Sequence, residues 1–206
     1  MALSLAAALA LAAQCAPAVA PETLLSVVQV ESRFDPLAIG VNGAPRIEVT
    51  PTSVEDAVGK AGALIAAGRN IDLGLAQINS KNLAWLGLSL REVFDPCRNL
   101  TAAARILADG YARSDAPRVG EQAALRTALS YYNTGHPARG LANGYVGKVT
   151  AAAGRIVPAI GAPEANPSDA PVAAPPAAAW DVFGDVGPAR GAFVTTVSIV
   201  TPGGSK

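Results

Sequence analysis

The chain has 206 residues, the length of one domain with room for an appended segment. Sixteen basic and sixteen acidic residues cancel, so no overall field favours nucleic acid or an anionic membrane as a partner. With a single histidine in the sequence we expect no metal site, and we expect no cofactor.

The first segment, residues 1–13, consists almost entirely of alanine and leucine. It resembles the apolar part of a secretory signal, although no lysine or arginine precedes it and it is too short to span a bilayer. A buried helix of the mature domain explains the same composition equally well. Both interpretations stay open at this point.

The next segment, residues 21–36, has the spacing of a helix with one apolar face. The residues at i, i+3, i+4 and i+7 are Leu24, Val27, Val28 and Glu31. Glu31 is therefore expected on the buried face, where desolvation raises the pKa of a carboxyl group and suits it to general acid catalysis. Alternatively, the last turn faces water or Glu31 pairs with Arg33.

Short elements follow this helix. Residues 38–41 read as one strand of a small hairpin or a strand-like loop, and a helix with Thr52 or Ser53 as N-cap ends near Gly68. Residues 71–79 start extended, and Gly74 indicates a close approach of the backbone to another group. A short helical stretch is expected at residues 83–86.

The second half of the chain reads as helices. Ser89 and Glu92 form a capping-box pattern, and amphipathic helices are predicted at residues 99–111, 120–132 and 145–156. From residue 158 proline, alanine and glycine dominate, which is typical of a linker or a disordered tail.

The sequence contains two cysteines, Cys15 and Cys97, far apart and outside any CxxC pattern. In an exported protein two cysteines suffice for one disulfide, which would tie the N-terminal segment to the rest of the domain. Two buried free thiols are the alternative if the protein stays in the cytosol.

Four short motifs occur in a fixed order. They are Glu31-Ser32-x-Phe34-x-Pro36, Gly74-Leu75-x-Gln77-Ile78-Asn79, Tyr132-Asn133-x-Gly135 and Tyr145-Val146. Together they resemble the soluble lytic transglycosylase domain of the goose-type lysozyme superfamily. The flanking words Cys15-Ala16-Pro17 and Phe94-Asp95-Pro96-Cys97 resemble the specialised members found in type IV secretion and conjugation systems.

The resemblance covers about residues 14–156, and the domain is expected at residues 14–157, between the apolar segment 1–13 and the tail 158–206. It implies a mainly α, lysozyme-like (α+β) fold, in which a helical bundle with a small β-hairpin surrounds a glycan cleft and a disordered C-terminal tail follows. The disulfide between Cys15 and Cys97 fits an envelope protein of this kind.

The resemblance also implies a function. Such enzymes cleave the bond between N-acetylmuramic acid and N-acetylglucosamine in peptidoglycan without water, leaving a 1,6-anhydromuramoyl end. Glu31 would be the catalytic acid and then the base. The positions carried over as substrate-binding are Ser32, Gly74, Leu75, Gln77, Asn79, Tyr132, Asn133 and Tyr145.

A periplasmic monomer that acts on glycan strands is expected, and the tail is the segment available for contact with secretion components. Two other functions stay open: a hydrolytic muramidase, and a non-catalytic glycan-binding assembly factor. A hydrolase normally needs a second carboxylate. Asp72 is the candidate, although a solvent-facing position is the stronger expectation for it.

Several neighbouring residues receive structural interpretations. Asp35 is expected to be a turn residue, and Phe34 and Trp85 are expected in the core rather than as platforms for sugar rings. Adjacent helical residues point about 100 degrees apart, so only one of Tyr131 and Tyr132 is expected to face the cleft. In the tail, the apolar islands 180–183 and 192–200 are either docking segments or scattered hydrophobic residues.

Overall fold

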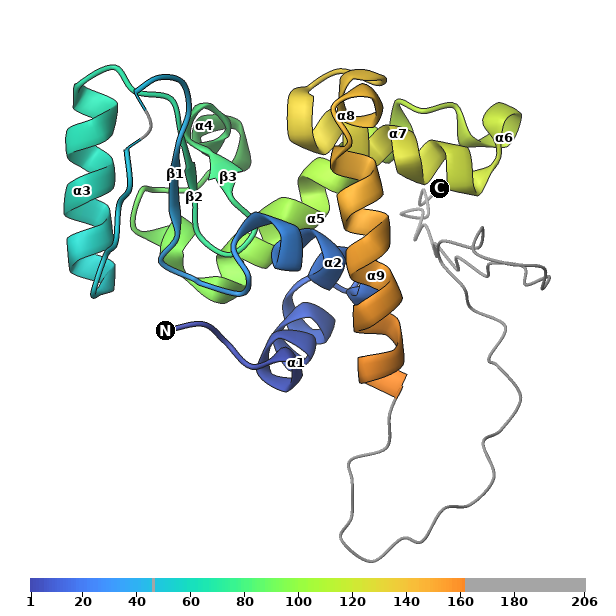
Figure 1. The fold of residues 1–206 in the computed structure, drawn as a ribbon, viewed down its shortest axis with the longest axis horizontal. Coiled ribbons are helices and arrows are strands. Elements are labelled where there is room, and N and C mark those ends of the chain that lie inside the picture. Colours follow the sequence, from blue (N-terminus) through green and yellow to red (C-terminus); the bar gives the residue numbers. More distant parts are fainter. Residues whose placement is uncertain (46, 162–206) are drawn as a thin grey trace, which may run out of the picture.

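The computed structural model describes residues 1–45 and 47–161. These residues form a mainly helical domain with one small sheet, as expected (Figure 1). The apolar islands of the tail, at 180–183 and 192–200, lie outside the described residues. None of the described helices is long and apolar enough to cross a membrane.

The sheet has three antiparallel strands in the order β1 (Ile39–Val41), β2 (Ile71–Leu73) and β3 (Ile78–Asn79). Strand β1 does not form a hairpin with the segment that follows it, because its partner is β2, some thirty residues later. The hairpin of the fold is instead β2–β3, in which Leu73 lies opposite Ile78. This register places Gly40 on one side of Asp72 and Asn79 on the other.

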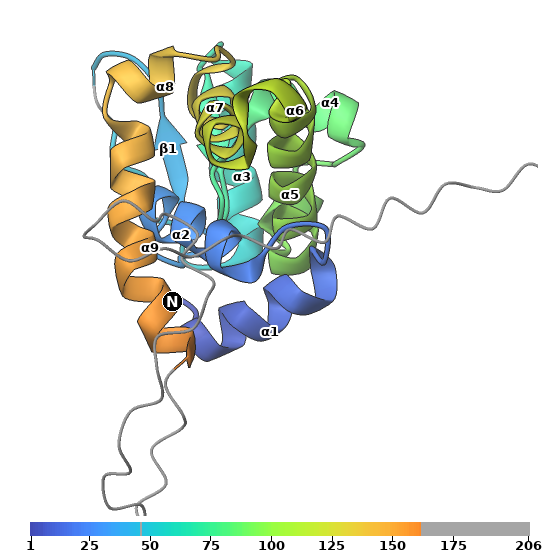
Figure 2. The same ribbon diagram turned by 90° about the vertical axis from the view of Figure 1, so that its right-hand side faces the viewer.

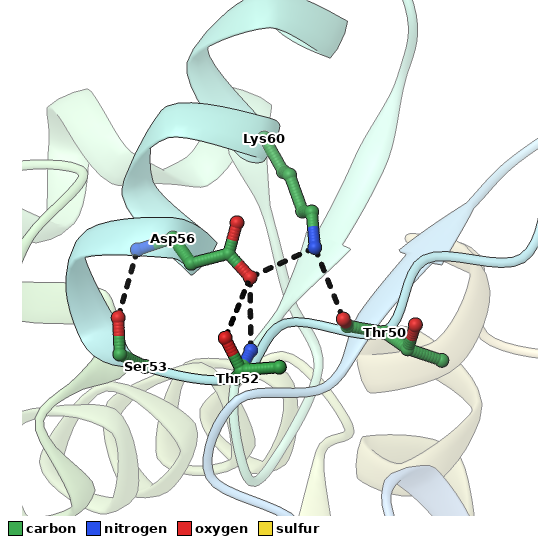
Figure 3. Close-up of polar contacts among 5 residues, drawn as sticks. All are labelled: Thr50, Thr52, Ser53, Asp56 and Lys60. Atoms are coloured by element: carbon green, nitrogen blue, oxygen red, sulfur yellow. Dashed lines mark hydrogen bonds and ion pairs between the residues drawn. The ribbon is translucent and has the colours of Figure 1, made fainter.

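Helix α3 (Val54–Ala66) covers the outer side of the sheet (Figure 1). Ser53 is its N-cap and accepts a hydrogen bond from the Asp56 N–H at 3.1 Å. The Asp56 carboxylate in turn accepts from the Thr52 N–H at 2.9 Å and from Lys60 at 2.8 Å (Figure 3). The Ser53 contact satisfies a backbone donor that the first turn of the helix leaves without a partner.

The other side of the sheet faces a helical lobe. It contains α7 (Glu121–Thr134), the short helices α6 (Ala116–Val119) and α8 (Arg139–Ala142), and α9 (Tyr145–Gly161). Helix α5 (Pro96–Ala112) runs between the two parts (Figure 1). Short helical turns at Ser80–Asn82, α4 (Leu83–Leu86) and Glu92–Phe94 connect the sheet to α5. The predicted capping box forms between Ser89 and Glu92.

Helix α2 (Pro21–Glu31) lies in the centre of the domain. Its predicted apolar face is fully buried, and the helix packs chiefly against α9 and also against α1 (Leu5–Cys15). The apolar N-terminal run is thus helical, and its Ala8 and Ala12 are buried. The domain boundaries drawn from composition stay predictions.

A disulfide joins Cys15 at the end of α1 to Cys97 at the start of α5, with the two Cα atoms 5.4 Å apart. This is the first of the two alternatives for the cysteines. The Thr101 hydroxyl lies next to it and contacts the carbonyl oxygens of both cysteines. The link therefore fixes the N-terminal helix to the helix that runs beneath the cleft.

The close approach predicted at Gly74 is made to Asn99 of α5. Gly74 has a φ of +74°, and a Cβ placed there would collide with the Asn99 side chain and lie 2.7 Å from the Val93 oxygen. The buried Asn99 amide accepts from the Ala76 N–H at 2.8 Å and donates to the carbonyls of Leu73 and Val93. One side chain therefore sets the turn between β2 and β3.

Helix α9 extends beyond its predicted end at Ile156 and reaches Gly161, with Pro158 inside it. A proline in a helix removes one backbone donor and crowds the residue four positions earlier. Here that residue is Gly154, and the proline falls in the last turn, so the helix continues for a few more residues. The inward-facing residues Val146, Val149 and Ala153 are buried as predicted.

Candidate active site

Glu31 is the last residue of α2, and the backbone turns sharply after it. Arg33 and Phe34 both have positive φ, of 55° and 67°, which is unusual for residues other than glycine. The Leu37 N–H donates to Asp35, which is the turn residue expected. Phe34 is buried, as expected, and anchors this turn in the core.

Glu31 opens into a cleft of about 500 Å³ between the sheet and α7. Five of the predicted site residues line it, namely Glu31, Gln77, Asn79, Tyr132 and Asn133. Ten more residues complete the lining: Asn42, Asn70, Asp72, Ile78, Lys81, Asn82, Ile106, Tyr131, Thr134 and Gly135. The cleft is therefore rich in carboxamide and hydroxyl groups, which both donate and accept hydrogen bonds.

The Glu31 carboxyl group is hydrogen-bonded to a phenol. The Tyr145 hydroxyl, at the start of α9, donates to Glu31 Oε1 at 2.5 Å. The pKa of Glu31 is raised from 4.5 to about 7, chiefly because of burial; the hydrogen bond from Tyr145 lowers it and the charge of Asp72 raises it within this net result. Burial and the nearby Glu31 also hold the pKa of Tyr145 well above its usual value. Glu31 can therefore carry a proton near neutral pH and also release it.

A short chain of hydrogen bonds holds Tyr145 in place. Its N–H donates to Asn143 Oδ1 at 3.0 Å, and Asn143 Nδ2 donates to Asn133 Oδ1 at 2.9 Å. Asn143 therefore links a residue that lines the cleft to the phenol that contacts Glu31. Asn143 was not predicted, because no motif marks it.

Asp72 lies in the cleft rather than facing solvent, so the stronger expectation for it was wrong. Its carboxylate accepts hydrogen bonds from Asn42 at 2.8 Å and from Asn79 at 2.7 Å. Burial raises the pKa of Asp72, and the two amide hydrogen bonds lower it. The strand register explains this position, because Asn79 on β3 is the direct partner of Asp72 on β2.

Gln77 and Tyr132 both contact the backbone of the β2–β3 region. Gln77 Nε2 donates to the carbonyls of Ala38 and Gly74, each at 3.0 Å. The Tyr132 hydroxyl donates to the Ala76 carbonyl at 2.6 Å. The Tyr132 contact therefore links α7 of the helical lobe to the turn between β2 and β3.

Four predicted substrate-binding residues lie outside the lining: Ser32, Gly74, Leu75 and Tyr145, of which Tyr145 contacts Glu31. Ser32 directs its hydroxyl back toward the Val28 carbonyl of its own helix. Gly74 forms the turn next to Asn99, and Leu75 is buried in the core. Substrate contact by these residues stays a prediction, and their observed contacts shape the wall of the cleft.

Two aromatic positions differ from expectation. Tyr131 and Tyr132 both line the cleft, with Arg113 placed 5.8 Å from the centre of the Tyr131 ring. Trp85 is 43% exposed and not in the core.

Asn70, which was also not predicted, lines the cleft with its Oδ1 buried and without a hydrogen-bond partner among the described residues. The described residues contain no cluster suited to a metal ion.

The hydrogen bond from Tyr145 to Glu31 leads to a prediction about how cleavage depends on pH. In a Tyr145→Phe variant the pKa of Glu31 should rise, because the hydrogen bond that lowers it is lost. Any cleavage that needs protonated Glu31 should then persist to higher pH, while its rate falls by roughly tenfold through looser positioning. A pH profile of kcat/KM for both proteins checks this, and an unchanged alkaline limb would contradict it.

The fold and the site agree with a comparison against known families. The family described as the transglycosylase SLT domain matches residues 8–153. The chain therefore belongs to the transglycosylase SLT domain family. No solved structure gives a significant match.

The chain is also similar to individual named proteins. The chain is 45% identical over 151 residues to the type IV secretion system protein virB1 of Brucella abortus biovar 1 (strain 9-941), a match that covers 70% of this chain and 63% of that protein. It is 40% identical over 173 residues to protein virB1 of Agrobacterium fabrum (strain C58 / ATCC 33970), covering 84% of this chain and 69% of that protein. The chain thus spans less than two thirds of the Brucella relative.

Proposed function

We propose that this protein is a lytic transglycosylase of the periplasm that opens peptidoglycan locally for the assembly of a type IV secretion system. The observation that carries the proposal is Glu31, a largely buried carboxyl group with a pKa of about 7 that lines a polar cleft and accepts a hydrogen bond from Tyr145. The names of the virB1 relatives support the secretion context. The protein would act on glycan strands as a monomer, and the tail after residue 157 would meet other secretion components.

In the proposed reaction, protonated Glu31 donates its proton to the oxygen of the β-1,4 bond between N-acetylmuramic acid and N-acetylglucosamine. The bond from the muramoyl anomeric carbon to that oxygen breaks. The ionised Glu31 then takes the proton of the muramoyl 6-hydroxyl, whose oxygen bonds to the anomeric carbon. Water is not consumed, and Glu31 ends protonated for the next turnover.

The position of Asp72 favours a second candidate, a hydrolytic muramidase. Asp72 lines the same cleft as Glu31, held by Asn42 and Asn79, and two carboxyl groups flanking the scissile bond are what a hydrolase uses. We prefer the lytic transglycosylase because the matching family is described as a transglycosylase domain.

Digestion of purified sacculi followed by mass spectrometry separates the two candidates. The proposal expects 1,6-anhydromuramoyl ends, which are lighter by one water than reducing ends. An Asp72→Asn variant should keep these ends, and its alkaline limb should move to lower pH because the charge that raises the pKa of Glu31 is gone. Reducing ends from the unmodified protein would overturn the proposal in favour of hydrolysis.

A further inference from the structure

Trp85 on α4 is the most exposed aromatic side chain for which the structure gives a number, at 43% of its surface. Other large aromatic residues of the domain are buried, such as Phe34 and Phe94. An indole ring left at the surface keeps a large apolar area in contact with water, and tryptophan is enriched at binding interfaces. The question is therefore what this ring contacts in the working protein.

Trp85 and its partner Arg105 both lie close along the chain to residues that line the cleft. Lys81 and Asn82 line the cleft, and Trp85 follows Asn82 by three residues, a spacing that places two helical positions on the same side. On α5, Ile106 lines the cleft and its neighbour Arg105 contacts the indole. Figure 2 shows α4 beside α5 at one edge of the domain, with α9 at the other.

Arg105 gives the ring a defined orientation. Its guanidinium carbon lies 5.0 Å from the centre of the Trp85 ring, the distance of a cation–π contact. A ring that is held before binding loses less conformational entropy when a ligand packs on it. The apolar C–H face of a sugar is suited to such a flat aromatic surface.

We propose that Trp85, oriented by Arg105, forms an additional subsite for a hexosamine unit of the glycan strand, next to the cleft that contains Glu31. This inference rests on the proposed function, because it assumes that a glycan polymer occupies the cleft. A polymer extends past the residues at Glu31, so an exposed ring close to the cleft lining is in a position to contact further units of the strand. The subsite makes the protein prefer long strands over short fragments.

Binding measured without turnover tests the subsite. In a Glu31→Gln, Trp180→Phe background, Trp85 is the only tryptophan, since the sequence has two. Its fluorescence is followed while a disaccharide or a hexasaccharide of β-1,4-linked N-acetylglucosamine is added. We expect the hexasaccharide to change the Trp85 emission and the disaccharide to leave it unchanged.

Substitutions in the same background give the size of the effect, with affinity measured by calorimetry. Trp85→Ala should weaken hexasaccharide binding by about tenfold, the upper range for one aromatic contact, and leave disaccharide binding unchanged. Trp85→Phe should lose less, and Arg105→Ala should give an intermediate loss. Ile65→Ala, which removes an apolar side chain of similar exposure on α3, is the matched control and should bind both oligomers normally.

The outcomes separate the two proposals. Hexasaccharide affinity that is equal in the Trp85 variants and their background, with an unchanged emission, overturns the subsite alone. A protein that binds no oligomer of either length overturns the proposed function and the subsite with it. Thermal unfolding of each variant shows that a loss of affinity comes from a folded protein.

Discussion

A Glu31→Gln variant should cleave purified sacculi about 10² to 10⁴ times more slowly than the unmodified protein, which is the contribution of a positioned general acid. Glutamine keeps the size of the side chain and can still meet the Tyr145 hydroxyl, but it carries no proton that it can transfer. The measurement is the release of soluble muropeptides over time. Near-normal cleavage by this variant would falsify the catalytic assignment.

Glu22→Gln is a suitable control, because Glu22 lies at the other end of the same helix, α2, and outside the cleft lining. It should cleave at the normal rate. If neither the unmodified protein nor any variant cleaves sacculi although glycan still binds, the third possibility, a non-catalytic glycan-binding assembly factor, becomes the better description.

The raised pKa of Glu31 should also make the stability of the folded protein depend on pH. The folded state holds the Glu31 proton up to a pH of about 7, whereas an ordinary glutamate releases it near 4.5. The folded state is therefore destabilised as the pH rises through this window, by about 3 kcal/mol in total. Below pH 4.5 the group is protonated in both states and contributes nothing.

Urea unfolding checks this consequence. The difference in unfolding free energy between Glu31→Gln and the unmodified protein should change in favour of the variant by about 3 kcal/mol between pH 4 and pH 8. The cleavage rate should also fall as the pH rises through 7, because Glu31 loses the same proton there and only its acid form donates a proton to the substrate. A pH-independent difference in stability would show that Glu31 is not buried as described.

Glu31 and Gly74 were predictable because their signals are local. Three apolar residues at helical spacing define the face that carries Glu31, and a glycine after an extended segment indicates a close contact whatever its partner is. The four-motif order also led to the correct family. These inferences need only the neighbours of a residue in the sequence.

The positions of Asp72 and Trp85 differ from the prediction because they depend on contacts between segments that are separated in the sequence. Asp72 is held by Asn42 from one neighbouring segment and by Asn79 on β3, and the pairing of β1 with β2 could not be read from either segment alone. A tryptophan in a short apolar stretch usually reads as core. Only the packing of α4 beside α5 shows that its ring stays at the surface next to Arg105.

Removal of the disulfide should have the largest effect on stability. The bond between Cys15 and Cys97 closes a loop across a sequence separation of 82 residues. In the chain-entropy model, such a link raises the free energy of unfolding by about 4 to 5 kcal/mol, because it restricts the unfolded chain. A Cys15→Ser, Cys97→Ser double variant should therefore unfold at a markedly lower urea concentration, and the unmodified protein in reductant should follow it.

Loss of the disulfide should also lower the activity of the cleft that contains Glu31. Helix α1 packs against α2, which carries Glu31, and against α5, which carries Ile106 of the lining. Partial release of α1 should therefore lower cleavage activity before the domain unfolds globally. The double variant is its own control, since reductant should not alter its unfolding. Equal unfolding midpoints for the oxidised and reduced forms of the unmodified protein would show that the link does not stabilise the domain.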